Sequence, residues 1–152
     1  MAPAAIAAQL DDTLEQVGPR LRAISADAAA ARPGPHQWSK KEILGHLIDS
    51  AANNHQRFVR LQSEDGLVLP SYQQNEWVRA QNYHGRDWQA LIDLWLAYNR
   101  HLAHVMRHSD AAAAQHTWKA TDAEYGLEFL MEDYLRHLCH HLEQILGASA
   151  VA

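Results

Sequence analysis

Two histidines near the end of the chain, His137 and His141, have a spacing that suits metal chemistry. If this segment is helical, a separation of four residues puts both imidazoles on one face, about one turn apart, where both can reach a single ion. Stepping about 100° per residue places His141 within the apolar stripe of the segment and His137 at its edge. His140 points outward. On its own the pair has two interpretations: two satisfied histidines at the edge of a helix, or part of a metal site.

A third ligand would complete such a site, and the segment that begins near Lys40 offers two candidates. His46 lies at one edge of the apolar stripe of that segment, and His55 lies at the other edge. Helical geometry alone does not choose between them. Three more histidines have ligand-like spacing on a later segment but point away from its stripe, so we expect solvent to surround them: His101, His104 and His108.

Other reactive residues near these histidines have simpler interpretations. Cys139 is two residues from each of His137 and His141, which puts it on a different helix face, so we expect a partly buried small residue and no nucleophile. Asp49 follows His46 by about one turn and could orient an imidazole, but we expect it to be solvated. Tyr134 is expected in the core. The sequence has no Gly-rich phosphate loop, GxSxG elbow or CxxC pair.

Helices must position these side chains, and four segments show the required apolar period of three to four residues. Ser39 and Glu42 form a capping box that starts the second segment, Asp87 can cap the third, and Gly147 can end the last. No segment alternates in the manner of a strand. We therefore predict an all-α four-helix bundle in a single domain, residues 1–152, with apolar stripes at residues 6–24, 43–61, 88–106 and 127–145.

Composition limits the classes of partner. The chain has 152 residues, a formal net charge of −5 and no run of Lys and Arg, so nucleic acid is not expected as a partner. No apolar run approaches the length that spans a membrane, and the first residues lack the basic start of a signal peptide. The single cysteine fits a reducing compartment. We expect a cytoplasmic protein with no membrane contact.

Two segments resemble a known family. Residues 38–49, WSKKEILGHLID, look like the helix-two signature of the DinB-like superfamily, and residues 137–145, HLCHHLEQI, are similar to its final helix, with HxxxH followed by Gln. The resemblance implies a three-histidine site for one divalent metal, made by His46, His137 and His141. Many members have Gly where this chain has Glu143, and the neighbouring His140 leaves the second ligand ambiguous.

The resemblance also implies a function. Three histidine ligands leave a coordination position open, as catalytic metal sites do. Relatives include transferases that activate a small thiol, so we expect a metal-dependent thiol S-transferase with zinc, nickel or iron as cofactor and a small-molecule thiol and an electrophile as partners. The alternatives are a metal-dependent hydrolase and a non-catalytic metal-binding or stress-response protein. We also expect a homodimer, because four tryptophans supply more large aromatic surface than four short helices readily cover: Trp77, Trp88, Trp95 and Trp118.

Overall fold

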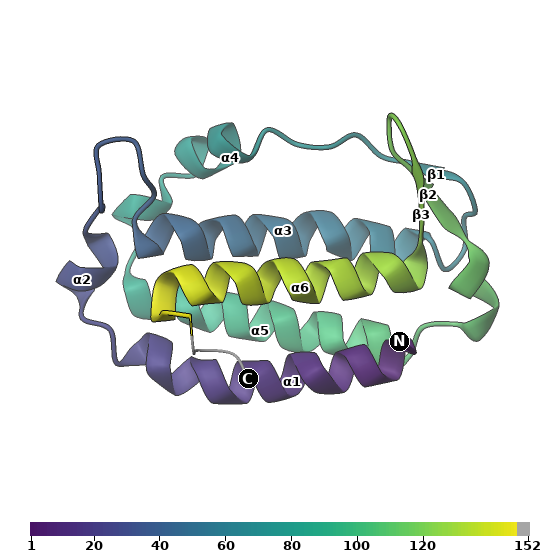
Figure 1. Cartoon of the computed structure of the whole chain (residues 1–152), viewed down its shortest axis with the longest axis horizontal. Coiled ribbons are helices and arrows are strands. Elements are labelled where there is room, and N and C mark those ends of the chain that lie inside the picture. Colours follow the sequence, from purple (N-terminus) through teal and green to yellow (C-terminus); the bar gives the residue numbers. More distant parts are fainter. Residues whose placement is uncertain (149–152) are drawn as a thin grey trace.

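Each of the four apolar stripes lies on a long helix in the computed structural model of the chain, which describes residues 1–148 (Figure 1). The helices pack their apolar faces on one another, so the prediction of an all-α four-helix bundle is confirmed. A fifth, short helix, α2, covers one end of the bundle. The long helices are α1 (Pro3–Arg22), α3 (Lys40–Arg60), α5 (Trp88–Arg107) and α6 (Leu127–Leu146), and α2 is Ala26–Ala30.

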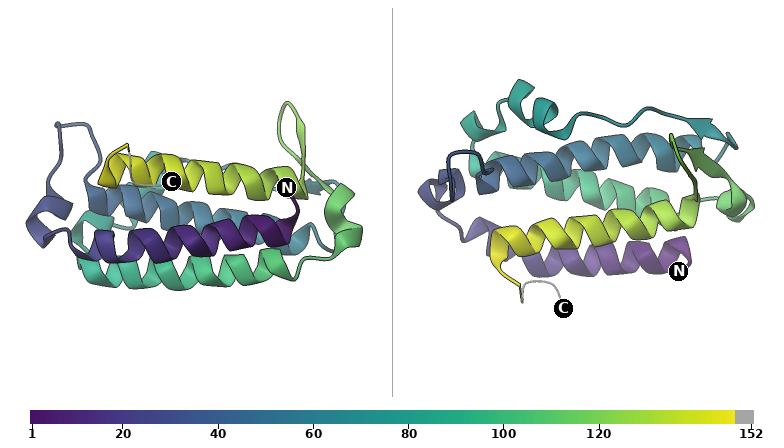
Figure 2. Two further views of the ribbon diagram at one scale, coloured as in Figure 1. Left: turned by 60° about the horizontal axis from the view of Figure 1, so that its bottom comes forward. Right: turned by 45° about the horizontal axis from the view of Figure 1, so that its top comes forward.

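The direction of the helices determines which of their ends meet. Helices α3 and α5 run the same way, whereas α1 and α6 run opposite to them (Figures 1 and 2). Both α1 and α3 contact α5 and α6. Because α3 and α5 are parallel, residues 61–87 must cross the length of the bundle between them, and they contain β1 (Leu67–Val68), α4 (Gln74–Ala80) and the 3-10 helix η1 (Tyr83–Gly85). The antiparallel contact of α3 with α6 brings the start of α3 beside the end of α6.

The predicted helix ends are confirmed. Ser39 Oγ accepts a hydrogen bond from the Glu42 backbone N–H at 3.3 Å, and a Glu42 carboxylate oxygen accepts one from the Ser39 N–H at 3.1 Å. Asp87 accepts from the Ala90 N–H at 2.9 Å. These bonds satisfy backbone donors that a helix start leaves unpaired. Gly147 follows α6 with φ of 99°, which only glycine adopts readily.

The core lies between the four helices and includes two of the tryptophans. Trp88 is 1% exposed and donates its indole N–H to the Leu21 carbonyl at 2.9 Å, and Trp95 is fully buried. Trp118 is half-buried, whereas Trp77 is exposed. The homodimer stays a prediction. It was based on four tryptophans, and the chain itself covers two of them. Within residues 1–148, no helix combines the length and hydropathy needed to cross a membrane.

A small sheet at one end of the bundle contradicts the expectation that the chain has no strands. Strand β1 pairs in parallel with β2 (Thr117–Lys119), and β2 pairs antiparallel with β3 (Glu124–Gly126). The 3-10 helix η2 (Ala111–Gln115) leads into it. Strands of two or three residues are too short to show an alternating pattern, so the sequence could not reveal them.

Residues 61–87, which we call the crossing segment, pack closely on α3 at a glycine. The ring of Tyr83 lies so close to Gly45 that a Cβ atom there would be 2.2 Å from a ring carbon. Tyr83 is 4% exposed, and its hydroxyl donates to Asp49 at 2.6 Å. A side chain at position 45 would therefore push Tyr83 out of this contact.

We predict that Gly45→Ala lowers the free energy of unfolding by about 1–3 kcal/mol, because the added methyl overpacks the Tyr83 contact. Gly18→Ala is the matched control: it is also inside a helix, and its Cβ would meet Leu96 at an ordinary 3.6 Å. That substitution should change the free energy of unfolding by less than about 1 kcal/mol, because the gain in helix propensity is opposed by crowding of the new Cβ against the Pro19 ring. Urea denaturation measures both effects. Equal effects of the two substitutions would contradict the proposed contact.

Candidate metal centre

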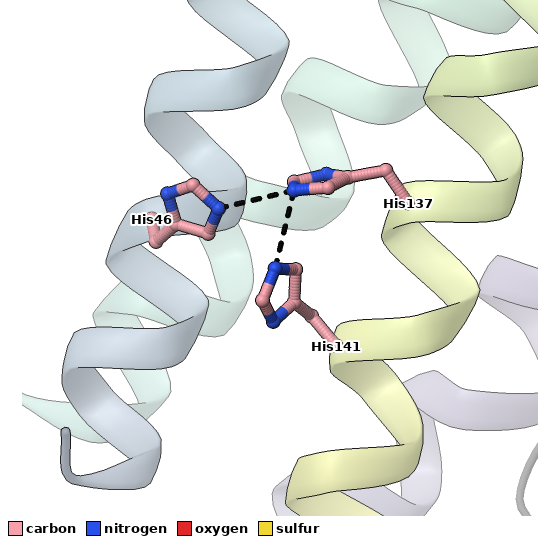
Figure 3. Close-up of side chains that lie close together, drawn as sticks. All are labelled: His46, His137 and His141. Atoms are coloured by element: carbon pink, nitrogen blue, oxygen red, sulfur yellow. Dashed lines mark hydrogen bonds between the residues drawn. The ribbon is translucent and has the colours of Figure 1, made fainter. Parts of the chain in front are cut away.

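The antiparallel pair α3 and α6 brings three histidines together (Figure 3). His46 lies in the second turn of α3, and His137 and His141 lie on successive turns of α6. The Nε2 atom of His137 is 3.2 Å from that of His46 and 3.1 Å from that of His141. One nitrogen from each ring lies within 4.8 Å of the other two. We call these three residues the histidine triad.

Two of the three separations within the triad match those around a single ion. Metal–nitrogen bonds of about 2.0–2.1 Å at tetrahedral angles hold ligand nitrogens about 3.3 Å apart. Hydrogen bonds among the rings cannot replace the ion, because a neutral imidazole nitrogen has either one hydrogen or one lone pair in its plane. His137 Nε2 faces two partner nitrogens and can pair with only one of them. An ion between the rings would accept all three lone pairs.

Burial keeps the triad in the form that binds metals. His46 is fully buried, and its desolvation, followed by the neighbouring imidazoles, lowers its pKa to about 3. Desolvation also lowers the pKa of His137 to about 4, again with a contribution from His141. The pKa of His141 is lowered, mainly by burial. The rings are therefore neutral at neutral pH, with lone pairs available for a ligand bond.

One residue outside the triad orients a member of it. Gln144 accepts a hydrogen bond from His141 Nδ1 at 2.7 Å, and its amide nitrogen lies 3.4 Å from His140 Nε2. An amide oxygen only accepts, so the hydrogen of His141 is on Nδ1 and the lone pair is on Nε2, which faces the triad. The sequence contained a signal for this contact, because residues three apart on a helix are neighbours.

The prediction that Asp49 is solvated is wrong. Its carboxylate is 2% exposed and accepts hydrogen bonds from the Tyr83 hydroxyl at 2.6 Å and the Gln81 amide at 2.8 Å. Burial raises the pKa of Asp49. Both partners come from the crossing segment, so nothing in the local sequence of α3 reveals this role. Asp49 anchors that segment beside the triad.

The remaining histidines lie elsewhere. His55 Nδ1 is 3.0 Å from the Tyr98 hydroxyl of α5, and the His55 ring packs on His101. His140 is exposed and does not join the triad. The three histidines that were expected in solvent are all exposed: His101 and His104 of α5, and His108 directly after it.

The two other candidates near the triad behave as the sequence suggests. Cys139 is half-buried, and burial raises the pKa of its thiol, so it is not an activated thiolate. Tyr134 is 2% exposed and donates its hydroxyl hydrogen to Asn99 at 2.5 Å. It is a core residue with a paired hydroxyl.

Two cavities flank the triad. One of about 540 Å³ lies beside Trp38, whose ring packs on His46, and Gln144 also lines it. A second, of about 200 Å³, is lined by His137 and by polar residues of α3 and of the crossing segment. The second cavity therefore reaches the triad at His137, whereas the first borders Trp38 and Gln144, which contact His46 and His141.

A sequence profile of the DinB superfamily matches residues 8–145 of this chain. The chain belongs to the DinB superfamily. A Halalkalibacterium halodurans protein named "Putative metal-dependent hydrolase" is 24% identical over 116 residues, which are 74% of this chain and 66% of that protein. The chain thus aligns with slightly less than two thirds of the length of that relative.

A solved structure shows the same fold as this DinB superfamily member. It is YfiT from Bacillus subtilis, described as "a probable metal-dependent hydrolase with an unusual four-helix bundle topology". The TM-score is 0.83 at 16% sequence identity, over 94% of this chain and 83% of the other. At this identity the likeness establishes the fold alone. Metal binding by His46, His137 and His141 stays a prediction.

We predict that this DinB superfamily protein binds one divalent ion per chain. Substituting His46, His137 or His141 by Ala should each lower the affinity at least about 100-fold, because two imidazoles hold an ion much less firmly than three. Substituting His101, His104 and His108 together by Ala should leave the affinity unchanged. Protein purified without a metal-binding tag is used for the measurements. Elemental analysis gives the number of ions per chain, and zinc titration gives the affinity. Equal losses in the two sets would rule out the triad.

The metal-free protein should lose stability as the pH falls from about 6.5 toward 4. In this range the imidazoles of the unfolded chain take up protons, whereas His46 and His137 stay neutral in the folded chain. The unfolded state then binds more protons than the folded state. The free energy of unfolding therefore falls by up to about 1.4 kcal/mol per pH unit for each histidine. Urea denaturation with a chelator present should show a smaller slope for His46→Gln than for wild type or His108→Gln. Identical slopes would contradict the prediction.

Proposed function

We propose that this protein is a metal-dependent thiol S-transferase, in which the histidine triad holds zinc, nickel or iron and a small thiol attacks an electrophile. The observation that supports this most directly is the convergence of three neutral imidazoles without a fourth side-chain ligand among residues 1–148. Structural zinc sites normally have four protein ligands, whereas catalytic sites keep a position for a substrate.

In this proposal the ion activates the thiol, and the protein holds the ion and orients one of its ligands. A bound divalent ion lowers the pKa of a thiol next to it, so that the reactive thiolate predominates at neutral pH. The triad residues hold the ion, and Gln144 keeps the His141 lone pair directed at it. The thiol proton passes to water. When the sulfur forms a bond to an electrophilic carbon, the leaving group departs with the electron pair of the bond that breaks.

The surroundings of the triad favour a thiol over water as the nucleophile. Metal-dependent hydrolases commonly use a carboxylate general base. Asp133 lines a cavity together with His137, but its carboxylate pairs with Arg136. The nearby Asp49 is held by Tyr83 and Gln81. A thiol of pKa about 8.5 needs no such base. Small thiols stay reduced in the cytoplasm, which is where we propose that the protein acts, as a homodimer.

A metal-dependent hydrolase is the second candidate, because the names of both relatives describe that activity. In this alternative water takes the place of the thiol, and the same three histidines hold the ion. The third possibility is a metal-binding or stress-response protein without catalysis. The three candidates differ in what the metal-loaded protein does to thiols and to esters.

We predict that metal-loaded protein conjugates a cellular thiol to 1-chloro-2,4-dinitrobenzene, releasing chloride. A panel of low-molecular-weight thiols, followed by absorbance of the conjugate, measures the rate. The rate should fall to the metal-free level in His141→Ala and on chelation. Cys139→Ala should keep full activity, because that thiol is not a participant.

The outcomes separate the candidates. Hydrolysis of activated esters without any thiol conjugation would favour the hydrolase. If the ion is bound and neither reaction exceeds the metal-free rate, the non-catalytic protein becomes the better account.

A further inference from the structure

The smaller cavity beside the triad has an arginine at the end away from His137. Its volume is about 200 Å³, and its walls come from α3, from residues 71–74 of the crossing segment and from α6. Arg57 lies 11 residues after His46 on α3, about 16 Å farther along the helix axis. Side chains on a helix lean toward its N-terminus, so the Arg57 guanidinium extends back toward the triad. The cavity residues are Ser50, Asn54, Arg57, Ser71, Tyr72, Gln74, Asp133, Tyr134 and His137.

The guanidinium of Arg57 is held in place but mostly unpaired. Its central carbon lies 4.0 Å from the centre of the Trp118 ring, so the planar group rests on the aromatic face. Within residues 1–148 it makes one hydrogen bond, from Nη1 to the Asn54 side-chain oxygen at 3.3 Å, and no ion pair. A guanidinium has five N–H donors. Stacking on a ring leaves the edge with these donors free for a planar anion.

The positions of Asn54 and Trp118 are themselves fixed. The Asn54 amide donates to the Ser50 carbonyl at 2.9 Å, which orients its oxygen toward Arg57. Trp118 belongs to β2 and donates its indole N–H to the Leu69 carbonyl at 3.1 Å. The small sheet therefore holds the aromatic face against which the guanidinium rests. Such a preorganised arginine loses little freedom when it binds a carboxylate.

The other ionisable groups of the cavity form no ion pair with Arg57. Asp133 also lines the cavity and interacts electrostatically with Arg57, but its carboxylate forms its ion pair with Arg136 of its own helix. The Nε2 atom of His137 faces His46 and His141 of the triad. Tyr72 contributes a phenol whose pKa burial raises to about 12, so it is uncharged. Arg57 therefore provides an unpaired positive charge in a small polar cavity, at the opposite end from His137.

We propose that this cavity binds a small thiol that bears a carboxylate, with the carboxylate on the free edge of Arg57 and the sulfur at the His137 end. The contact of the sulfur rests on the proposed function, whereas the contact of the carboxylate with Arg57 does not. Arginine binds a carboxylate through two parallel hydrogen bonds, which amide and hydroxyl groups cannot match. Arg57 is thus the residue that selects an acidic thiol over a neutral one.

The preference for an acidic thiol over a neutral one can be tested with cobalt-loaded protein. Its absorption spectrum changes when a thiolate binds the ion. We would titrate 4-mercaptobutanoate and 6-mercaptohexanoate against their neutral amides. Wild-type protein should bind at least one acid about 10-fold or more tightly than its amide, as a charge-assisted hydrogen-bond pair allows. Arg57→Gln should abolish this preference and leave the amide affinity within twofold, and Arg57→Lys should keep part of it. Arg60→Gln, one turn away and paired with Glu64, is the control and should behave as wild type.

A second measurement on metal-free protein separates this proposal from the proposed function. Butanoate, which has no sulfur, should shift the Nε–H signal of Arg57 in a nitrogen-15 spectrum, and Arg57→Gln identifies that signal by its loss. If no thiol binds the cobalt protein but butanoate shifts the signal, the thiol function fails and the carboxylate site stands. If thiols bind without preference for the acid and butanoate leaves the signal unchanged, the proposal for Arg57 is overturned. Arg57→Lys also removes that signal, so it identifies the signal if Arg57→Gln fails to fold.

Discussion

Three imidazole nitrogens meet between α3 and α6 at separations of 3.1 and 3.2 Å, in an interior that keeps their rings neutral. Each nitrogen offers one lone pair or one hydrogen, so the three cannot satisfy one another. Such an arrangement is costly unless something else occupies the common point. These rings are held by the antiparallel contact of α3 with α6 and by the bond of Gln144 to His141, beside the point where Asp49 anchors the crossing segment.

The crossing segment connects the fold to the functional site. Because α3 and α5 are parallel, the chain must return along the bundle, and it does so across the face that carries the triad and the smaller cavity. Gly45 admits the Tyr83 ring at one end of this path, and Asp49 receives its hydroxyl. At the other end, β1 pairs with β2 and places Trp118 against Arg57. A connection that the topology requires thus also forms a wall of the cavity.

The sequence predicted the helices well, because their signals are local. The capping box at Ser39 and the cap at Asp87 each involve residues three apart. The choice between His46 and His55 was not local: the two edges of the α3 stripe face different neighbours, and His55 faces Tyr98 of α5. Only the resemblance to the family identified His46. The burial of Asp49 and the stacking of Arg57 depend on partners from distant segments, so no spacing on α3 could reveal them.

The separation of the triad along the chain also bears on how the protein is made. His46 and His137 are 91 residues apart, so the triad cannot assemble until α6 has been synthesised. At translation speeds of about 5–20 residues per second, His46 leaves the ribosome on the order of 5–20 s before its partners. During that time the nascent chain offers His46 without its two triad partners. Acquisition of the predicted ion by the triad would therefore follow translation, and a chain whose synthesis stops before α6 would lack the triad.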